Sequence, residues 1–185
     1  MAEEKKIIYC IPGLGQDRLA EKIEQGPNLY LLGVSLGGMM SVEIAKHLSV
    51  EKLILISTVK NRDEMPATFD WMGKIPMKSN SLPKFVIDAQ VLLKPFYGKA
   101  NQKGIDLFEK MLKSASLNFI RWAWNQIPEW ESKGLPKAPF IHLHGTADLV
   151  FPIKHIDQAI TLKGATHFAI FNDKKKLNQL IELFL

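Results

Sequence analysis

The chain has 185 residues, of which 46% are hydrophobic and 23% are charged. This length and this apolar fraction predict a single domain, residues 1–185, with a substantial core. The formal net charge is +5, but no element of a nucleic-acid-binding module accompanies the basic residues, so we expect no nucleic-acid partner. No apolar run approaches the roughly 18 residues that a membrane-spanning helix requires, so we expect no transmembrane segment.

Residues 1–6 contain acids and lead directly into an apolar run, so they lack the pattern of a secretory signal. Cys10 is the only cysteine, which excludes an intramolecular disulfide and agrees with a reducing cytoplasm, the location that we expect. Because Cys10 lies in an apolar run, we expect it to fill a small space in the core.

Five short apolar runs predict β-strands. They cover residues 6–11, 29–33, 53–57, 140–144 and 159–163. The runs are almost continuous rather than alternating, which is typical of parallel strands buried on both faces. Apolar residues at spacings of three and four predict helices over residues 36–48 and 174–184, and a shorter helix is predicted over 17–25. The expected fold class is therefore α/β, with a mostly parallel sheet of about five strands and flanking helices.

Residues 60–137 separate the third predicted strand from the fourth, and this segment is too long for a plain connection. Prolines divide it into short helices, of which the clearest are 101–115 and 116–127. We expect a helical cap inserted after the third strand. Most of its aromatic residues should pack the cap onto the sheet, and the remainder could line a substrate-binding acyl pocket. The candidates for that pocket are Trp71, Phe119 and Trp122.

The second predicted strand ends in Gly33-Val34-Ser35-Leu36-Gly37, and a helical pattern follows at once. This is the G-x-S-x-G pattern of a nucleophile elbow, in the strand-then-helix context that the pattern needs. A serine in a sharp, strained turn brings backbones close together, so the positions two before and two after it must lack a Cβ. The simpler interpretation is a strand-to-helix connection in which Ser35 caps the helix.

The loops after two later strands carry the other residues that a serine nucleophile needs. Asp148 follows the strand at 140–144, and His167 follows the strand at 159–163. A histidine can take the proton of a serine hydroxyl, and a carboxylate can orient that histidine and stabilise its cationic form.

Other acids and histidines have simpler interpretations. Asp63, after the third strand, is the alternative acid, but its local match is weaker than that of Asp148. We interpret His142 and His144 as hydrogen-bonded structural histidines rather than bases. The remaining histidines have no partner at ligand spacing, so we predict no metal site.

These motifs together resemble the α/β-hydrolase superfamily, which has the chain order serine, acid, histidine. The resemblance rests on Gly33 to Gly37, on His144-Gly145-Thr146-Ala147-Asp148 and on Gly164-Ala165-Thr166-His167. A further match, Ile11-Pro12-Gly13-Leu14-Gly15, follows the first strand, where the family places its oxyanion loop. The resemblance implies a Ser35–His167–Asp148 triad and an oxyanion hole made by the backbone N–H groups of Leu14 and Leu36.

The chain departs from the family pattern after its first strand. Only residues 15–28 lie between that strand and the elbow strand, so about thirty to forty residues, an edge strand and a helix among them, are missing from the pattern. This reduced form predicts an exposed apolar patch beside strands 6–11 and 29–33. Such a patch tends to be covered, either by rearranged chain or by a partner such as a second copy in a homo-oligomer.

The function that these residues predict is that of a serine hydrolase. Its substrate would be a small-molecule carboxylic ester or thioester, cleaved through an acyl-enzyme intermediate without a metal or an organic cofactor. The alternative is an α/β-hydrolase-like protein with weak or no catalysis that binds a small apolar ligand or a partner. Hydrolysis of a short-chain ester that is lost in Ser35→Ala distinguishes the two.

Overall fold

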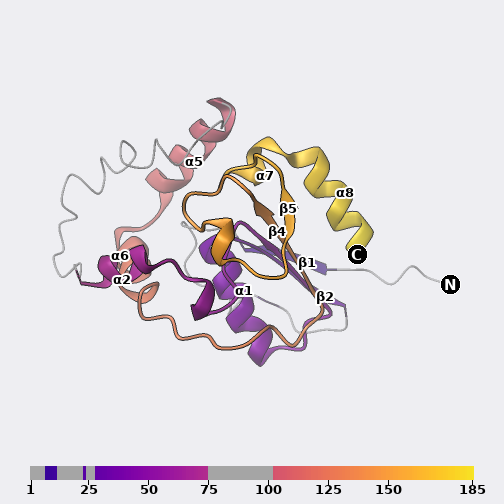
Figure 1. The fold of residues 1–185 in the computed structure, drawn as a ribbon, viewed down its shortest axis with the longest axis horizontal. Helices are drawn as coiled ribbons and strands as arrows, with labels where there is room; N and C mark the ends of the chain where they lie inside the picture. The colour runs from indigo at the N-terminus through magenta and orange to yellow at the C-terminus, as the bar shows by residue number, and fades with distance from the viewer. Residues whose placement is uncertain (1–6, 12–22, 24–27, 75–101) are drawn as a thin grey trace.

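A computed structural model describes residues 7–11, 23, 28–74 and 102–185. Its centre is a sheet of five parallel strands (Figure 1). The strands are β1 (Ile7–Ile11), β2 (Leu29–Val34), β3 (Lys52–Ile56), β4 (Phe140–Gly145) and β5 (Ile160–Leu162). They lie side by side in their chain order. The five predicted strands and the parallel sheet are therefore confirmed, although β5 is shorter than expected.

Helices flank both faces of the sheet. Figure 1 shows α1 (Leu36–His47) on one side and α8 (Lys174–Phe184) on the other, with the short α7 (Ala169–Asn172) just before α8. Both long helices agree with the prediction. The predicted helix at 17–25 lies outside the described residues apart from Ile23, which is buried in the core.

Three α-helices and one 3₁₀ turn are described within residues 60–137. They are η2 (Arg62–Glu64), α2 (Ala67–Gly73), α5 (Gln102–Ser114) and α6 (Leu117–Gln126). A second 3₁₀ turn, η3 (Ile153–His155), lies between β4 and β5. The two longer helices agree with the sequence pattern, and α2 and α6 pack together (Figure 1). Residues 75–101 of this segment lie outside the described residues, so the helical cap stays a prediction.

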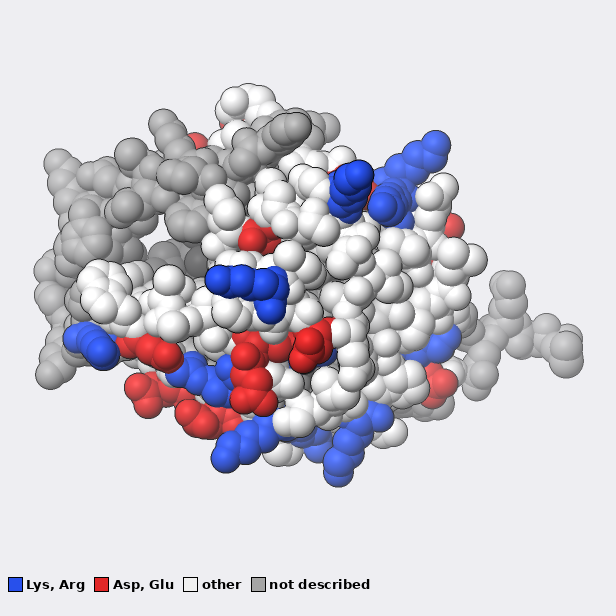
Figure 2. Space-filling view, viewed as in Figure 1, with Lys and Arg blue, Asp and Glu red and all other residues white. Residues whose placement is uncertain are grey.

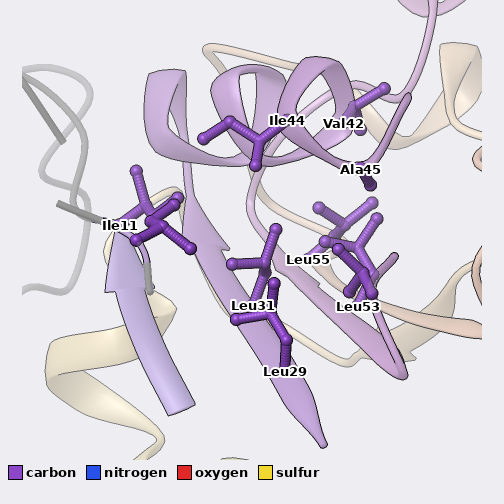
Figure 3. Packing of buried hydrophobic residues seen from close by; sticks show 10 residues of the cluster. Ile11, Leu29, Leu31, Val42, Ile44, Ala45, Leu53 and Leu55 are labelled. Atoms are coloured by element: carbon purple, nitrogen blue, oxygen red, sulfur yellow. The ribbon is translucent and has the colours of Figure 1, made fainter. Parts of the chain in front are cut away.

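The two faces of the sheet bury alternate residues of each strand. Leu31 and Leu55 face α1 and join a buried cluster with Val42 (Figure 3). Ile54 and Ile56 face the opposite side, where they pack with residues of α7 and α8. A strand buried on both faces has no polar side to expose, which is why the central strands read as continuous apolar runs.

A third buried cluster ties the first turn of α1 to the segment between β3 and β4. Leu36 and Met39 pack there with Phe119 of α6 and with Phe151, which lies in the loop after β4. This cluster fixes α6 and the loop after β4 beside the residue where β2 meets α1. The end of the sheet at which Ser35 lies is therefore held by side chains from three separate parts of the chain.

The edge strand β1 is more exposed than the three central strands. Tyr9 and Ile11 join the cluster under α1, whereas Ile7 and Ile8 are 38% and 40% exposed. Cys10 is exposed as well, so its predicted place in the core is wrong. The reason is strand geometry: Cys10 points to the side opposite Tyr9 and Ile11, and β1 has one neighbour, β2, among the described strands. The neighbouring β2 residues are buried or half-buried, so of these two strands only β1 has exposed apolar side chains.

On the face drawn in Figure 2, acidic and basic side chains of the described residues are interspersed, and a broad uncharged area lies to the right of the centre. In the described part of the chain, no helix is long and apolar enough to cross a membrane.

Candidate active site

Ser35 lies at the junction between β2 and α1 with a strained backbone. Its φ of 55° and ψ of −125° lie in a region that non-glycine residues rarely occupy. Two contacts hold this conformation: the Ser35 N–H donates to the carbonyl of Ile56 over 3.1 Å, and the Thr58 hydroxyl donates to the Ser35 carbonyl over 2.6 Å. The side chain of Ser35 makes no capping hydrogen bond to α1, so the interpretation of Ser35 as a helix cap is wrong.

The glycines around Ser35 are required by close contacts. A Cβ on Gly33 would overlap the hydroxyl of Ser41 and lie 2.6 Å from the carbonyl oxygen of Gly37. A Cβ on Gly38 would lie 2.5 Å from the side chain of Thr58. The sequence pattern identified Gly33 and Gly37 but missed Gly38, because its neighbour Thr58 lies just after β3 and only the folded chain brings them together.

The structure brings the three predicted side chains into one chain of hydrogen bonds. His167 Nε2 lies 2.9 Å from Ser35 Oγ, and His167 Nδ1 lies 2.9 Å from Asp148 Oδ2. Each of the three residues lies in a segment that follows a different strand. They meet because parallel strands end at the same edge of a sheet. Asp63, the alternative acid, is exposed in η2.

Asp148 is buried and surrounded by donors. Its Oδ1 accepts the backbone N–H groups of Val150 and Phe151 at 2.8 and 3.0 Å. Burial by itself raises the pKa of the Asp148 carboxyl, but the hydrogen bond and charge of His167 and the Phe151 N–H outweigh it, so the pKa lies below its ordinary value. Asp148 is therefore ionised at neutral pH and accepts the Nδ1–H of His167.

The imidazole of His167 is only 14% exposed and is bordered by two aromatic rings. The Phe151 and Phe168 rings lie 5.6 and 6.2 Å from it, both edge to face. These contacts limit rotation of the ring, so its Nε2 lone pair stays directed at Ser35 Oγ. Because the Asp148 carboxylate accepts at Nδ1, the neutral ring presents an acceptor, not a donor, to the serine hydroxyl.

One of the two residues predicted to donate to an oxyanion, Leu36, lies at the start of α1. Leu36 is the first residue of α1, and the first N–H groups of a helix have no acceptor within that helix. The N-terminus of a helix also favours negative charge. The second predicted donor, Leu14, lies outside the described residues.

A cavity of about 400 Å³ runs along α1 from the Ser35 end of the helix. It lies between α1 and α6. Its lining residues are Leu36, Met39, Met40, Glu43, Ile44, Trp122, Gln126, Ile127, Glu129, Trp130 and Glu131. Of the three aromatic residues predicted to bind substrate, Trp122 lines this cavity, Phe119 is buried behind it with its ring 5.6 Å from that of Trp122, and Trp71 is 65% exposed elsewhere.

His142 and His144 are buried and hydrogen-bonded to each other, in agreement with the interpretation of both as structural histidines. Beside them lies a buried ion pair, Lys60–Glu64, that the sequence analysis did not single out. Its only sequence signal is two opposite charges four residues apart directly after an apolar strand. Within the described residues, no group of three or more His, Cys, Asp and Glu side chains is arranged to hold a metal ion.

Comparison with known proteins identifies the fold. No protein-family model and no curated protein sequence matches the chain, but many solved structures do. A hydrolase from Pseudomonas aeruginosa aligns with a TM-score of 0.60 at 17% identity, over 84% of this chain and 64% of the other. A thermophilic esterase from Thermogutta terrifontis aligns with a TM-score of 0.61 at 17% identity, over the same shares. An alpha/beta fold family hydrolase from Bacillus anthracis aligns with a TM-score of 0.53 at 16% identity, over 84% and 66%.

The chain therefore has the α/β-hydrolase fold, as the sequence motifs indicated. It spans about two thirds of the length of these structures. At such low identity the likeness establishes the fold alone, and the activity has to be argued from the site.

Proposed function

We propose that the chain is a serine hydrolase that cleaves carboxylic esters, thioesters included, through an acyl-enzyme intermediate. One observation carries the proposal: Ser35 Oγ, His167 and Asp148 form a continuous chain of two 2.9 Å hydrogen bonds at the end of a parallel sheet. A nucleophile, a base and a group that orients the base are the three parts that this chemistry needs.

The first step is attack on the ester carbonyl. His167 Nε2 takes the proton of the Ser35 hydroxyl as the oxygen bonds to the carbonyl carbon, and Asp148 stabilises the imidazolium that forms. Negative charge then develops on the former carbonyl oxygen. The N–H of Leu36 at the start of α1 faces this charge, and one such donor stabilises the transition state by about 3 kcal/mol.

The second half of the reaction reuses the same groups. His167 gives its proton to the leaving alcohol or thiol, and the tetrahedral intermediate collapses to an ester of Ser35. Water then attacks this acyl-enzyme with His167 as base, and the carboxylic acid leaves as Ser35 regains its proton.

The cavity beside α1 supports an apolar acyl or alcohol group. Met39, Met40 and Trp122 line it, and small-molecule sites are mostly apolar with a few polar groups. Its first lining residue, Leu36, directly follows the nucleophile. That an esterase is among the structures of this fold that the chain resembles agrees with this choice of substrate class.

The proposal is tested by labelling with a fluorophosphonate and by hydrolysis of short-chain p-nitrophenyl esters. We expect label on the peptide that contains Ser35 and turnover that is lost in Ser35→Ala. Ser49→Ala removes an exposed serine just after α1 and is the matched control, which should keep both signals. Equal background rates in wild type and Ser35→Ala, with no label on Ser35, would overturn the enzyme and favour the ligand-binding alternative.

A further inference from the structure

Lys60 is a fully buried lysine whose three donors all have acceptors. It lies a few residues after β3 and has no exposed surface. Its Nζ donates to the Glu64 carboxylate, to the Asp157 carbonyl over 2.7 Å and to His142 Nδ1 over 3.1 Å. Glu64 in turn accepts the backbone N–H groups of Lys60 and Asp157. The mechanism above uses none of these groups, yet burial of a charge is costly unless every partner is in place.

From Lys60 a line of contacts leads to the acid of the proposed triad. His142 Nε2 lies 3.2 Å from His144 Nδ1. His144 Nε2 lies 2.8 Å from the carbonyl of Phe151 and 3.4 Å from Asp148 Oδ2. Phe151 is also the residue whose N–H donates to Asp148 Oδ1. His144 therefore contacts the acid both directly and through Phe151, whose carbonyl faces His144 and whose N–H binds Asp148.

The positions of the protons along this line follow from its two ends. An ammonium group can only donate, so His142 Nδ1 accepts and its proton lies on Nε2. His142 then donates to His144 Nδ1, which leaves the proton of His144 on Nε2. At the other end, the Phe151 carbonyl can only accept, which independently places a proton on His144 Nε2. Lys60 at one end and the Phe151 carbonyl at the other therefore require the same proton order, a proton on Nε2 of each histidine.

This order requires both histidines to be neutral. Burial lowers the pKa of His142 to about 2, with help from the charges of Lys60 and His144 and against a hydrogen bond from the ring to the backbone carbonyl of Thr58. Burial also lowers the pKa of His144, against the Phe151 hydrogen bond and the charges of Asp148 and Glu64. Neutral rings that each donate once and accept once satisfy every contact in the line.

We propose that Lys60, His142 and His144 are positioning residues for Asp148. The buried cation sets the direction of the hydrogen bonds, so His144 presents an N–H to Phe151 and Asp148 rather than a lone pair. The loop of residues 148–151 then has one orientation, with Asp148 Oδ2 aligned on His167 Nδ1. The inference rests on the proposed function, since a fixed acid is useful only to a working triad.

The proton order is tested without any activity, by nitrogen NMR of histidine-labelled protein. We expect His142 and His144 to be neutral Nε2–H tautomers between pH 5 and 8, assigned with His142→Phe and His144→Gln. A charged ring, or the Nδ1–H form of either ring, would overturn the proposed proton positions on His142 and His144. This reading stands even if Ser35 proves unreactive, so the two proposals can fail separately.

The positioning role is tested by a matched pair at His144. Phenylalanine removes both the donor and the acceptor, whereas glutamine keeps an amide donor and a carbonyl acceptor at similar reach. For His144→Phe we expect fluorophosphonate labelling of Ser35 to slow by about tenfold to a hundredfold, the scale on which a misplacement of about 1 Å is felt. His144→Gln should stay within about threefold of wild type, because it preserves both hydrogen bonds.

A second readout follows the Asp148–His167 contact itself. The Nδ1–H proton of His167 should resonate far downfield in the wild type, and this signal should shift or disappear in His144→Phe but remain in His144→Gln. If His144→Phe does not fold, the pair of changes Lys60→Met and Glu64→Gln removes the buried charges together and tests the far end of the line. Wild-type labelling and an unshifted proton signal in a folded variant would overturn the positioning role.

Discussion

The two ends of the proposed triad are held in place by different physical means. Ser35 is fixed mainly by steric packing among glycines that leave no room for a Cβ, and two hydrogen bonds of its backbone, with Ile56 and Thr58, support its strained conformation. Asp148 is fixed by polar contacts, namely two backbone N–H groups, His167 and the buried line that begins at Lys60. A steric site leaves short glycine motifs in the sequence, whereas a polar site depends on residues that are distant along the chain.

The largest effect should come from changing the charge at the polar end. In Asp148→Asn the amide keeps an acceptor for Val150 and Phe151, but the group that faces His167 can become a donor, which favours the wrong tautomer of the ring. We expect kcat to fall by about 10⁴-fold, the scale of this replacement in a serine–histidine–aspartate triad. Ester hydrolysis measures the effect. Asp63→Asn at the exposed alternative acid is the control, and a comparable loss there would identify Asp63 as the acid.

At the steric end, Gly33→Ala should impair both folding and reactivity. The new Cβ would overlap Ser41 and the backbone of Gly37, so we expect a loss of about 3 kcal/mol in the free energy of unfolding and slower labelling of Ser35. Urea unfolding measures the first quantity. Gly134→Ala has open space around its Cβ and only its φ of 73° to oppose it, so it should cost about 1 kcal/mol. Equal costs at the two glycines would contradict the steric explanation.

Low pH should reduce the free energy of unfolding through the buried titratable groups around Asp148. The pKa values of His142 and His144 are lowered in the folded chain, so below about pH 6.5 the unfolded chain binds protons that the folded chain does not. The contribution of each histidine to the free energy of unfolding is therefore fully present above that pH. Below it, this contribution falls by up to about 1.4 kcal/mol per pH unit. The lowered pKa of Asp148 adds a further loss at more acidic pH, below about 4.

Urea midpoints measured from pH 7 to pH 4 should follow this trend. The slope should be smaller in His142→Phe, which removes one of the two buried rings. His47→Gln, at an exposed position on α1, should keep the slope of the wild type. A wild-type midpoint that is constant over this range would show that the two buried rings do not resist protonation.

The smallest expected effect is at the hydroxyl that supports the strained serine. Thr58→Val keeps the shape of the side chain but removes the 2.6 Å hydrogen bond to the Ser35 carbonyl. One hydrogen bond contributes about 1 kcal/mol, so we expect a labelling rate about fivefold lower. Thr161→Val, at an exposed position of β5, is the control and should label at the wild-type rate.

Much of the fold could be predicted because the strands are buried on both faces. A continuous apolar run such as that of β3 indicates a strand buried on both faces, and every strand end lies within one residue of its predicted position. The prediction for Cys10 was wrong because an apolar run does not tell an edge strand from a central one. Whether a residue of β1 is covered depends on what packs against it from elsewhere in the chain.

The sequence by itself predicted that Ser35, Asp148 and His167 lie together, because each follows a strand and parallel strands end at one edge, and their hydrogen bonds agree with this. It also determined the need for Gly33, since a strained serine excludes a neighbouring Cβ. Only the tertiary structure decided that Thr58 supports the serine and that Lys60, Glu64, His142 and His144 lie in one buried line leading to Asp148. Contacts between residues in or after different strands depend on register and packing, and no local pattern in the chain encodes them.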